Sequence, residues 1–329
     1  MKILVTGAAG FIGSHTCERL LKNKTIKKVI GVDHLGDGSV KNLKKIIKNK
    51  KFFFKKVDIR DKKYFINLFK KIDVVIHLAA ISDIVPSINQ PNEYLDVNFN
   101  GTLNILENMR KNKVKKIIFA ASSSCYGIPK SLPTKEIDTI NPRYPYAFSK
   151  YISEQLIIHW SNVYKLNFIS LRLFNVYGTR SRTNNAYGAA IGVFIKQKLS
   201  KKPFTVVGTG KQKRDFINVK DVAELFHKCV FTNVKNEIFN VGSGKPKSVN
   251  YLLKLLKGKK IKVPKRPGEP NITHANINKI KNKLNWTPKI SFEEGIKEVL
   301  ENKYYWSKAP LWTKKKIQKA TKNWFKYLR

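Results

Sequence analysis

The chain has 329 residues, 42% of them hydrophobic, which is enough to bury a full core and excludes a disordered chain. Its formal net charge of +43 comes mostly from lysines spread along the sequence, since only ten of the 65 basic residues are arginine. A nucleic-acid surface would gather arginine and aromatic side chains in one stripe. We therefore interpret the charge as a solvated surface whose field attracts a diphosphate ligand, and we expect no nucleic-acid partner.

Signals for membranes, metals and disulfides are also missing. No run of 18 apolar residues indicates a membrane span, and the N-terminus lacks a signal-peptide pattern. Three cysteines lie far apart without metal-ligand spacing: Cys17, Cys125 and Cys229. We expect a cytoplasmic protein without a metal site.

The first half of the chain alternates short apolar runs with longer amphipathic ones. The apolar runs predict strands buried on both faces, at residues 3–5, 29–32, 52–57, 74–78, 117–121 and 168–173. The amphipathic runs predict helices at residues 13–22, 64–69, 98–112 and 146–164. This rhythm is typical of an α/β fold with a Rossmann-type, doubly wound parallel sheet.

After about residue 173 the rhythm breaks, and glycine and proline become more frequent. We predict a first domain over residues 1–174, with return segments near 215–245, and a smaller α/β lobe over residues 175–329. We expect the basic tail beyond residue 300 to dock onto the body, because tryptophan is highly buried on average. The tail contains three tryptophans: Trp306, Trp312 and Trp324.

A glycine-rich turn directly follows the first predicted strand and opens the first predicted helix. Gly7, Gly10 and Gly13 permit a tight bend, close approach of the backbone to a pyrophosphate, and close packing of helix on strand. About 20 residues further on, Asp33 ends the second strand. A carboxylate there can bond the hydroxyls of an adenosine ribose and would repel a 2′-phosphate. These features predict NAD as the cofactor, in preference to NADP.

Further cofactor contacts are expected where the next strands end. A side chain at the end of the third strand could meet the adenine edge. Small residues after the fourth strand leave room for a flat dinucleotide, whereas His77 is expected to be packed and not catalytic. Besides the glycines and Asp33, the predicted cofactor contacts are Phe11, Ile12, Asp58, Ile59, Leu78, Ala79, Ala80 and Asn98.

A serine cluster, residues 122–124, ends the fifth predicted strand, and Tyr146 and Lys150 follow on the next helix. At spacing i and i+4 these two side chains share one helical face. Proton transfer near neutral pH needs a phenol pKa below the usual value of about 10. We expect the neighbouring ammonium and a positively charged nicotinamide to lower the pKa of Tyr146. We therefore predict that a serine, Tyr146 and Lys150 act on an alcohol, with Tyr146 and Lys150 also contacting NAD.

Together these motifs resemble extended short-chain dehydrogenase/reductases, specifically the UDP-glucose 4-epimerase group, over nearly the full length. Three later motifs share the resemblance, at residues 173–178, 214–217 and 266–269. It implies that Asn175, Arg214 and Arg266 bind the diphosphate of a UDP-sugar and nearby groups, and that Glu269 holds the uridine ribose. An arginine fork suits a diphosphate. Five of the ten arginines lie in or beside these motifs: Arg172, Arg180, Arg182, Arg214 and Arg266.

The resemblance also implies a reaction. Tyr146 removes the proton from the sugar 4-hydroxyl as hydride passes from C4 to NAD, the 4-keto sugar turns over, and hydride returns to its other face. This series of steps epimerises a UDP-hexose such as UDP-glucose or UDP-galactose. By the same resemblance the catalytic serine is Ser122 and the second hydroxyl is Ser124, with Ser123 as an open alternative. All three serines and Tyr146 are expected to contact the substrate.

Other reactions and substrates stay open. The related 4,6-dehydratases have Thr-Asp-Glu in place of residues 122–124, so this chain lacks that acid and base, and dehydration is disfavoured. The alternatives are a UDP-glucuronate 4-epimerase or decarboxylase, another nucleotide-sugar-modifying member and, remotely, a non-catalytic NAD-binding protein. The serine run and residues 185–189 look similar to epimerases that accept N-acetylated sugars, and the small Thr273 leaves space for an N-acetyl group, which adds UDP-GlcNAc and UDP-GalNAc. We also expect a homodimer through helices near 98–112 and 146–164.

Overall fold

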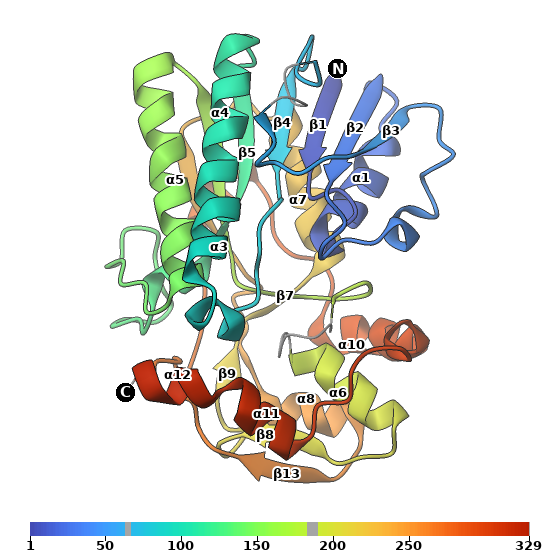
Figure 1. Cartoon of the computed structure of the whole chain (residues 1–329), viewed down its shortest axis with the longest axis vertical. Coiled ribbons are helices and arrows are strands. Elements are labelled where there is room, and N and C mark those ends of the chain that lie inside the picture. Colours follow the sequence, from blue (N-terminus) through green and yellow to red (C-terminus); the bar gives the residue numbers. More distant parts are fainter. Residues whose placement is uncertain (63–66, 183–189, 329) are drawn as a thin grey trace.

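The computed structural model describes residues 1–62, 67–182 and 190–328. Within these ranges, seven parallel strands form one sheet in the order β11–β6–β5–β4–β1–β2–β3 (Figure 1). The strands are β1 (Lys2–Thr6), β2 (Lys28–Asp33), β3 (Phe52–Lys56), β4 (Val74–His77), β5 (Lys116–Ser122), β6 (Asn167–Leu173) and β11 (Glu237–Val241). The strand order reverses between β1 and β4, which confirms the predicted doubly wound sheet. Such folds bind ligands at this reversal, beyond the carboxyl ends of the strands.

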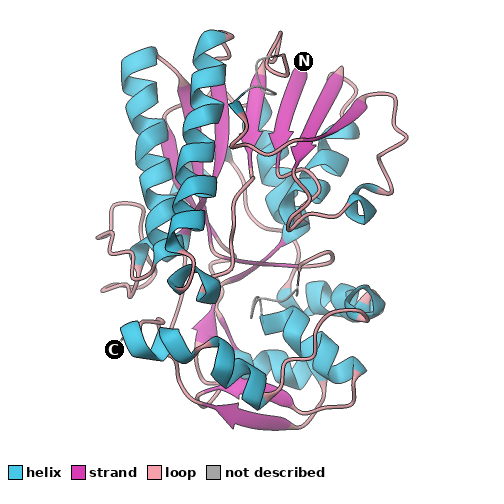
Figure 2. Ribbon diagram, in the orientation of Figure 1, coloured by secondary structure: helices cyan, strands magenta, loops and turns pink. Residues whose placement is uncertain are grey.

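Helices cover both faces of the sheet (Figure 2). They are α1 (Phe11–Leu21), α4 (Gly101–Lys111), α5 (Pro145–Tyr164) and α7 (Val219–Phe231). Ile3 and Val5 enter one apolar core together with α1 and α7, whereas Leu4 enters a second core together with α4 and α5. Alternate residues of a strand point to opposite faces, so a sheet covered on both sides has continuously apolar strands. This is why the strands were visible in the sequence.

The ends of the helices differ from the predicted ones. Helix α1 begins at Phe11, two residues earlier than expected. The region predicted as one helix at 98–112 follows α3 (Pro91–Leu95) and starts with a π-helical turn, η3 (Asp96–Asn100), before α4. The helix predicted at 64–69 lies partly outside the described residues.

The second half of the chain forms a smaller lobe below the sheet in Figure 1. Its two-stranded sheets are β10–β7, β12–β9 and β13–β8. The strands are β7 (Asn175–Tyr177), β8 (Phe204–Val207), β9 (Lys213–Arg214), β10 (Phe216–Asn218), β12 (Lys247–Ser248) and β13 (Lys260–Val263). The helices of this lobe are α6 (Ala190–Leu199), α8 (Val249–Leu256), α10 (Phe292–Glu301), α11 (Lys314–Ala320) and α12 (Lys322–Tyr327), whereas α9 (Asn278–Leu284) packs against β11 in a core of the large sheet. Short helical turns are η1 (Val40–Leu43), η2 (Val85–Ile88), η4 (Ser123–Tyr126) and η5 (Lys303–Trp306).

The chain crosses between the two halves more than once. Strand β11 lies beside β6 at the edge of the large sheet, and α7 packs on α1. The division into domains at residue 174 stays a prediction. The tail docks on the lower lobe as expected, since its three tryptophans are buried in the core of that lobe. No helix in the described part of the chain has both the length and the hydropathy that a membrane crossing requires.

Candidate active site

The glycine-rich loop between β1 and α1 is packed so closely that two of its glycines have no room for a side chain. At Gly7, where φ is +69°, a Cβ atom would lie 2.8 Å from the backbone nitrogen of Ala79. At Gly13 a Cβ atom would collide with the carbonyl oxygen of Gly7. Gly10 is the N-cap of α1, and no side chain caps that end of the helix. Bare backbone at a helix N-terminus suits a pyrophosphate, so the loop fits the predicted dinucleotide.

Asp33 ends β2 beside this loop and is buried. Its carboxylate accepts hydrogen bonds from the backbone nitrogens of Ala9 (3.0 Å) and Leu35 (2.8 Å). Burial raises the pKa of this carboxyl, while those bonds oppose the shift. The bonds hold the carboxylate next to the loop, where the ribose of a dinucleotide would meet it. Phe11 and Ile12 form the first turn of α1.

The chain is also held tightly where it leaves β4. The backbone nitrogens of Leu78 and Ala79 both donate to the hydroxyl of Thr6, each at 3.1 Å. Ala80 follows, partly exposed, and Ile59 is buried after β3. These bonds fix the small residues that were expected to leave room for a dinucleotide.

Two predicted cofactor residues have partners within the protein. Asp58 forms an ion pair with Arg60 at 2.7 Å, which lowers the pKa of the Asp58 carboxyl. The Asn98 amide accepts from the nitrogen of Ile81 (2.9 Å) and donates to its carbonyl oxygen (3.1 Å) and to the Ser149 hydroxyl (2.9 Å). Asn98 thereby ties the segment after β4 to α5. The contacts of Asp58 and Asn98 with the cofactor stay predictions.

His77, at the end of β4, is a packed residue as expected. Its ring nitrogens form hydrogen bonds with the hydroxyls of Thr6 (2.7 Å) and Thr102 (2.9 Å). Burial, together with the charge of Lys150, lowers the pKa of His77 to about 3. The ring is therefore neutral near pH 7 and unsuited to proton transfer there.

The fold brings Ser122, Tyr146 and Lys150 together at the carboxyl end of the sheet. Ser122 is the last residue of β5, and Tyr146 lies in the first turn of α5, where its hydroxyl hydrogen-bonds with Ser122. Lys150 lies one turn further along α5 and is only 4% exposed. Its ammonium lies 4.1 Å from the ring centroid of Phe119. A hydroxyl, a phenol and an amine thus meet where ligands of such a sheet bind.

The electrostatics of this group differ from the sequence expectation. Burial raises the pKa of Tyr146, and the bond to Ser122 opposes the shift only in part. The expected lowering by Lys150 is therefore wrong for the chain alone. Burial instead lowers the pKa of Lys150 to about 7, with Glu154 opposing. Desolvation disfavours the charged form of both groups, so it moves their pKa values in opposite directions.

The three serines, which the sequence could not rank, have different neighbours. Ser122 bonds Tyr146, and its oxygen also accepts from the backbone nitrogen of Ser124 at 3.2 Å. The hydroxyl of Ser124 bonds Tyr144, two residues before Tyr146. Ser123 lies between them, partly exposed. The geometry thus favours Ser122 as the partner of the phenol.

Arg214 and Arg266 converge on Glu269. The guanidinium of Arg266 lies 2.8 Å from the Glu269 carboxylate, and that of Arg214 lies 3.7 Å from it. All three side chains are 17–18% exposed. Burial and the neighbouring Arg266 lower the pKa of Arg214. Two guanidiniums share one carboxylate, so the cluster keeps an excess positive charge for an anionic ligand such as a diphosphate.

The orientation of the Asn175 side chain follows from a short chain of hydrogen bonds. The Thr273 hydroxyl accepts from the backbone nitrogen of Asp215 at 3.0 Å, so its own hydrogen is left for Asn175 Oδ1, also at 3.0 Å. Asn175 Nδ2 must then point the other way, and it makes no hydrogen bond with the described residues. It is available to a ligand. Residues 185–189, the other signal for N-acetylated sugars, lie outside the described residues.

All five arginines noted in the sequence form ion pairs within the protein, and three of them pair with carboxylates other than Glu269. Buried Arg172 lies 2.6 Å from Glu154, and Arg180 lies 2.7 Å from Glu18 of α1. Arg182 pairs with Asp37, in the turn after β2. These ion pairs could not be predicted, because the sequence cannot show the carboxylate partners, and a role of these three arginines toward an anionic substrate stays a prediction.

Asp215 is a site residue that sequence reasoning missed. It is fully buried and accepts four hydrogen bonds, from Ser243 N and Oγ (2.6 Å each), Gly244 N (3.1 Å) and Ala275 N (2.9 Å). It thereby holds together three loops that border Arg214 and Thr273. The sequence did contain a signal for this residue, namely an acidic side chain directly before the apolar residues 216–217. An acid in such a position is expected to be buried, and a buried carboxylate needs hydrogen-bond partners.

Comparison with known proteins places this site in a family. Residues 3–242 match the NAD dependent epimerase/dehydratase family, so the chain belongs to it. It is an NAD-dependent, nucleotide-sugar-modifying enzyme of the epimerase or dehydratase type, and NAD is its cofactor. A putative UDP-glucose 4-epimerase of Methanocaldococcus jannaschii is 40% identical over 306 residues, which are 91% of this chain and 97% of that protein.

Two solved structures are similar over almost the whole chain. The UDP-N-acetylglucosamine 4-epimerase of Methanobrevibacter ruminantium, in complex with UDP-N-acetylmuramic acid, has a TM-score of 0.86 at 31% identity, covering 91% of this chain and 97% of that one. The UDP-glucuronic acid 4-epimerase of Bacillus cereus, in complex with UDP-glucuronic acid and NAD, has a TM-score of 0.84 at 34% identity, covering 94% and 99%. These relatives act on different sugars.

Proposed function

We propose that this protein interconverts UDP-hexoses at C4, with UDP-glucose and UDP-galactose as substrates and UDP-GlcNAc and UDP-GalNAc accepted as well. The observation that carries the proposal is the contact of Tyr146 with Ser122, one helical turn from Lys150. Arg214, Arg266 and the open amide of Asn175 supply the groups that would hold a diphosphate.

In the proposed reaction Tyr146 acts as a phenolate, a form that burial disfavours and that the positive charge of bound NAD would favour. The phenolate takes the proton from the sugar 4-hydroxyl and later returns it to the same oxygen. Ser122 orients that oxygen through its own hydroxyl. Lys150, whose pKa is lowered to about 7 by burial, can lose or hold a proton beside the phenol near neutral pH. NAD, when bound, supplies the hydride acceptor and donor that this chemistry needs. The product differs from the substrate only in configuration at C4.

Dehydration is less well supported, because elimination needs an acid and a base beside the sugar. Ser123 and Ser124 offer only hydroxyls there. N-acetylated sugars are supported by Thr273, whose small side chain leaves space that a tyrosine would fill. The lysines do not indicate which substrate is bound, because they are spread over the whole chain.

The proposal is tested with purified protein and UDP-galactose, UDP-GalNAc and UDP-glucuronate side by side, without added cofactor. We expect both hexoses to be converted to their C4 epimers and bound NAD to be detectable by absorbance. Protein that binds NAD but converts no UDP-hexose would refute the proposal. Conversion of UDP-glucuronate alone would instead show that the protein is specific for UDP-glucuronate.

Asp83 supports a neutral hexose over a uronate. When ionised, it raises the pKa of Tyr146, so the carboxylate lies within electrostatic reach of the phenol, while burial raises the pKa of Asp83 itself. The hydroxyl of Tyr94 donates to the backbone oxygen of Asp83 at 2.5 Å, and the Tyr94 ring packs edge-on against that of Tyr146 at 6.4 Å. A substrate carboxylate bound here would meet a like charge.

Asp83→Asn should therefore improve use of UDP-glucuronate relative to UDP-galactose. We expect the ratio of the two kcat/KM values to rise about tenfold, since removing one like-charge contact at partly screened range is worth about 1.4 kcal/mol. Asp96→Asn, an exposed acid paired with Arg60, is the control and should leave the ratio unchanged. An unchanged ratio in Asp83→Asn would remove this basis for the hexose preference.

Thr273→Val removes the hydroxyl that fixes the Asn175 amide while nearly keeping the side-chain volume. We expect UDP to bind roughly tenfold more weakly, because the amide is free to turn its oxygen toward the diphosphate and one or two hydrogen bonds are lost. Calorimetric titration with UDP measures the effect. Thr273→Ser restores the hydroxyl and should restore the affinity. Equal affinity in Thr273→Val and the unaltered protein would contradict the assigned orientation.

We also propose that two copies pair through α4 and α5. Helix α5 exposes Phe148, Val163 and Tyr164, and a hollow of about 230 Å³ beside Trp160 and Tyr164 lies between α4 and α5. Exposed apolar side chains on one helix, next to a hollow shared with its neighbour, are typical of a self-association surface. Light scattering at micromolar concentration should give the mass of a dimer, and a monomer would contradict the pairing.

A further inference from the structure

The C-terminal helices α11 and α12 lie across the lower lobe (red in Figure 1) and reach the segment that contains Arg266 and Glu269. Trp324 of α12 is only 1% exposed, and its indole Nε1 donates to the carbonyl oxygen of Pro267 at 2.9 Å. A Cβ atom at Gly268 would lie 3.9 Å from Leu328. The end of the chain therefore packs directly against the turn between the two ligand-binding side chains.

The same indole also contacts the catalytic helix. Its ring lies 5.2 Å, centroid to centroid, from the ring of Tyr144. Tyr144 is the N-cap residue of α5, two positions before Tyr146, and its hydroxyl bonds Ser124. Helix α12 is further fastened beside η2, where Asn323 donates to the side chain of Asn89 at 2.7 Å. Trp324 thus contacts both the turn at residues 266–269 and the beginning of helix α5, which carries Tyr146.

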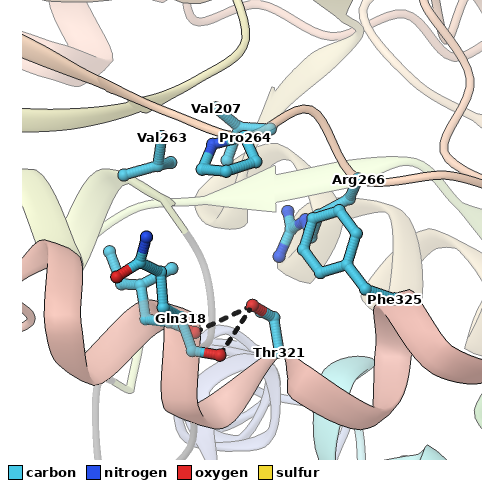
Figure 3. Close-up of a pocket in the computed structure, with 8 residues that line it drawn as sticks. Val207, Val263, Pro264, Arg266, Gln318, Thr321 and Phe325 are labelled. Carbon is cyan, nitrogen blue, oxygen red and sulfur yellow. Dashed lines mark hydrogen bonds between the residues drawn. The ribbon is translucent and has the colours of Figure 1, made fainter.

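Elsewhere the tail and the lobe are separated by a cavity of about 280 Å³ (Figure 3). The tail side is formed by Ile317, Gln318, Thr321 and Phe325, and the lobe side by Val207, Val263, Pro264 and Arg266. Figure 3 shows the guanidinium of Arg266 beside the ring of Phe325. One end of the turn is held by Arg214, which donates to the carbonyl oxygen of Pro270 at 3.0 Å, and the other end is held by the Trp324 hydrogen bond to Pro267.

We propose that Trp324 is a positioning residue of the nucleotide-sugar site, which sets the turn 266–269 relative to Tyr146. The inference rests on the proposed function. Residues 264–271 contain no helix or strand, so backbone hydrogen bonds of regular structure do not hold this turn. Without the indole N–H, the part of the turn around Pro267 must be ordered at the moment of binding, and the conformational entropy lost there weakens the affinity.

Trp324→Phe tests the inference, because it removes the N–H while keeping an aromatic ring against Tyr144. Trp306→Phe is a matched control: Trp306 is also 1% exposed, and its Nε1 donates to a backbone oxygen, that of Ser181, at 2.8 Å. Each protein is titrated with UDP by calorimetry, and its melting temperature, bound NAD, and kcat and KM for UDP-galactose are measured.

We expect both variants to melt a few degrees lower, and bound NAD in Trp324→Phe to stay at the level of the unaltered protein. Only Trp324→Phe should bind UDP about tenfold more weakly and raise KM by a similar factor, with kcat changed less than threefold. Unchanged UDP affinity in Trp324→Phe, or equal losses in both variants, would overturn the inference. Failure of the unaltered protein to bind UDP would instead refute the proposed function. If Trp324→Phe does not fold, a chain ending at Lys322 is judged by the same criteria.

Discussion

Tyr146→Phe is expected to reduce turnover of UDP-hexoses by about three orders of magnitude while NAD stays bound. General acid–base groups contribute about 10²- to 10⁴-fold, and this hydroxyl is the group placed against Ser122. The ring of Tyr146 is retained, so its contact with Tyr94 and the packing of α5 should persist. Chromatographic separation of the two epimers, with NAD absorbance recorded on the same sample, measures both quantities.

Tyr94→Phe is the control for this variant. It removes a phenol hydroxyl from the neighbouring ring, one that bonds the backbone of Asp83. We expect its activity to stay within a fewfold of that of the unaltered protein, because this hydroxyl donates its hydrogen bond to the protein backbone. Activity of Tyr146→Phe within tenfold of the unaltered protein would show that another group transfers the proton.

Lys150→Met should abolish epimerisation and at the same time stabilise the protein. Burial lowers the pKa of Lys150 to about 7, compared with 10.5 in an unfolded chain, so folding must remove a proton or bury a charge. The variant escapes this cost, which amounts to a few kcal/mol at pH 7. Glu154 keeps its partner, Arg172, at 2.6 Å, so no carboxylate is left unpaired.

The pH dependence of that gain has a definite sign. Between pH 7 and 10.5 the unfolded chain binds more protons at Lys150 than the folded one, so this residue makes stability rise with pH across that window. The advantage of Lys150→Met should therefore be largest below about pH 7 and shrink toward pH 10. Urea unfolding of both proteins at pH 6, 8 and 9.5 measures the difference between their free energies of unfolding. The other lysines titrate equally in both proteins, so their contribution cancels.

Lys150→Arg is the informative counterpart. Arginine keeps the positive charge at every accessible pH and cannot give up the proton. We expect it to be less stable than the unaltered protein and to have little activity. If Lys150→Met were less stable at pH 7 than the unaltered protein, the view that Lys150 is held at an energetic cost would be wrong.

Much of the fold could be predicted from the sequence, because it depends on short-range patterns. Strands buried on both faces are continuous apolar runs, and Gly7 and Gly13 lie where only bare backbone fits. The relation of Tyr146 to Lys150 follows from helical spacing alone. Less accurate were the helix ends, such as the π-helical turn before α4, which depend on a few competing hydrogen bonds.

The sequence by itself thus determined the doubly wound sheet, the cofactor loop and the pairing of Tyr146 with Lys150. Only the tertiary structure decided which serine meets Tyr146, which arginines face Glu269, and how Thr273 turns Asn175. It also decided that Trp324 reaches Pro267, 57 positions away. These pairings are between residues distant in sequence, and burial, which sets the pKa values of Tyr146 and Lys150, exists only once the chain is packed.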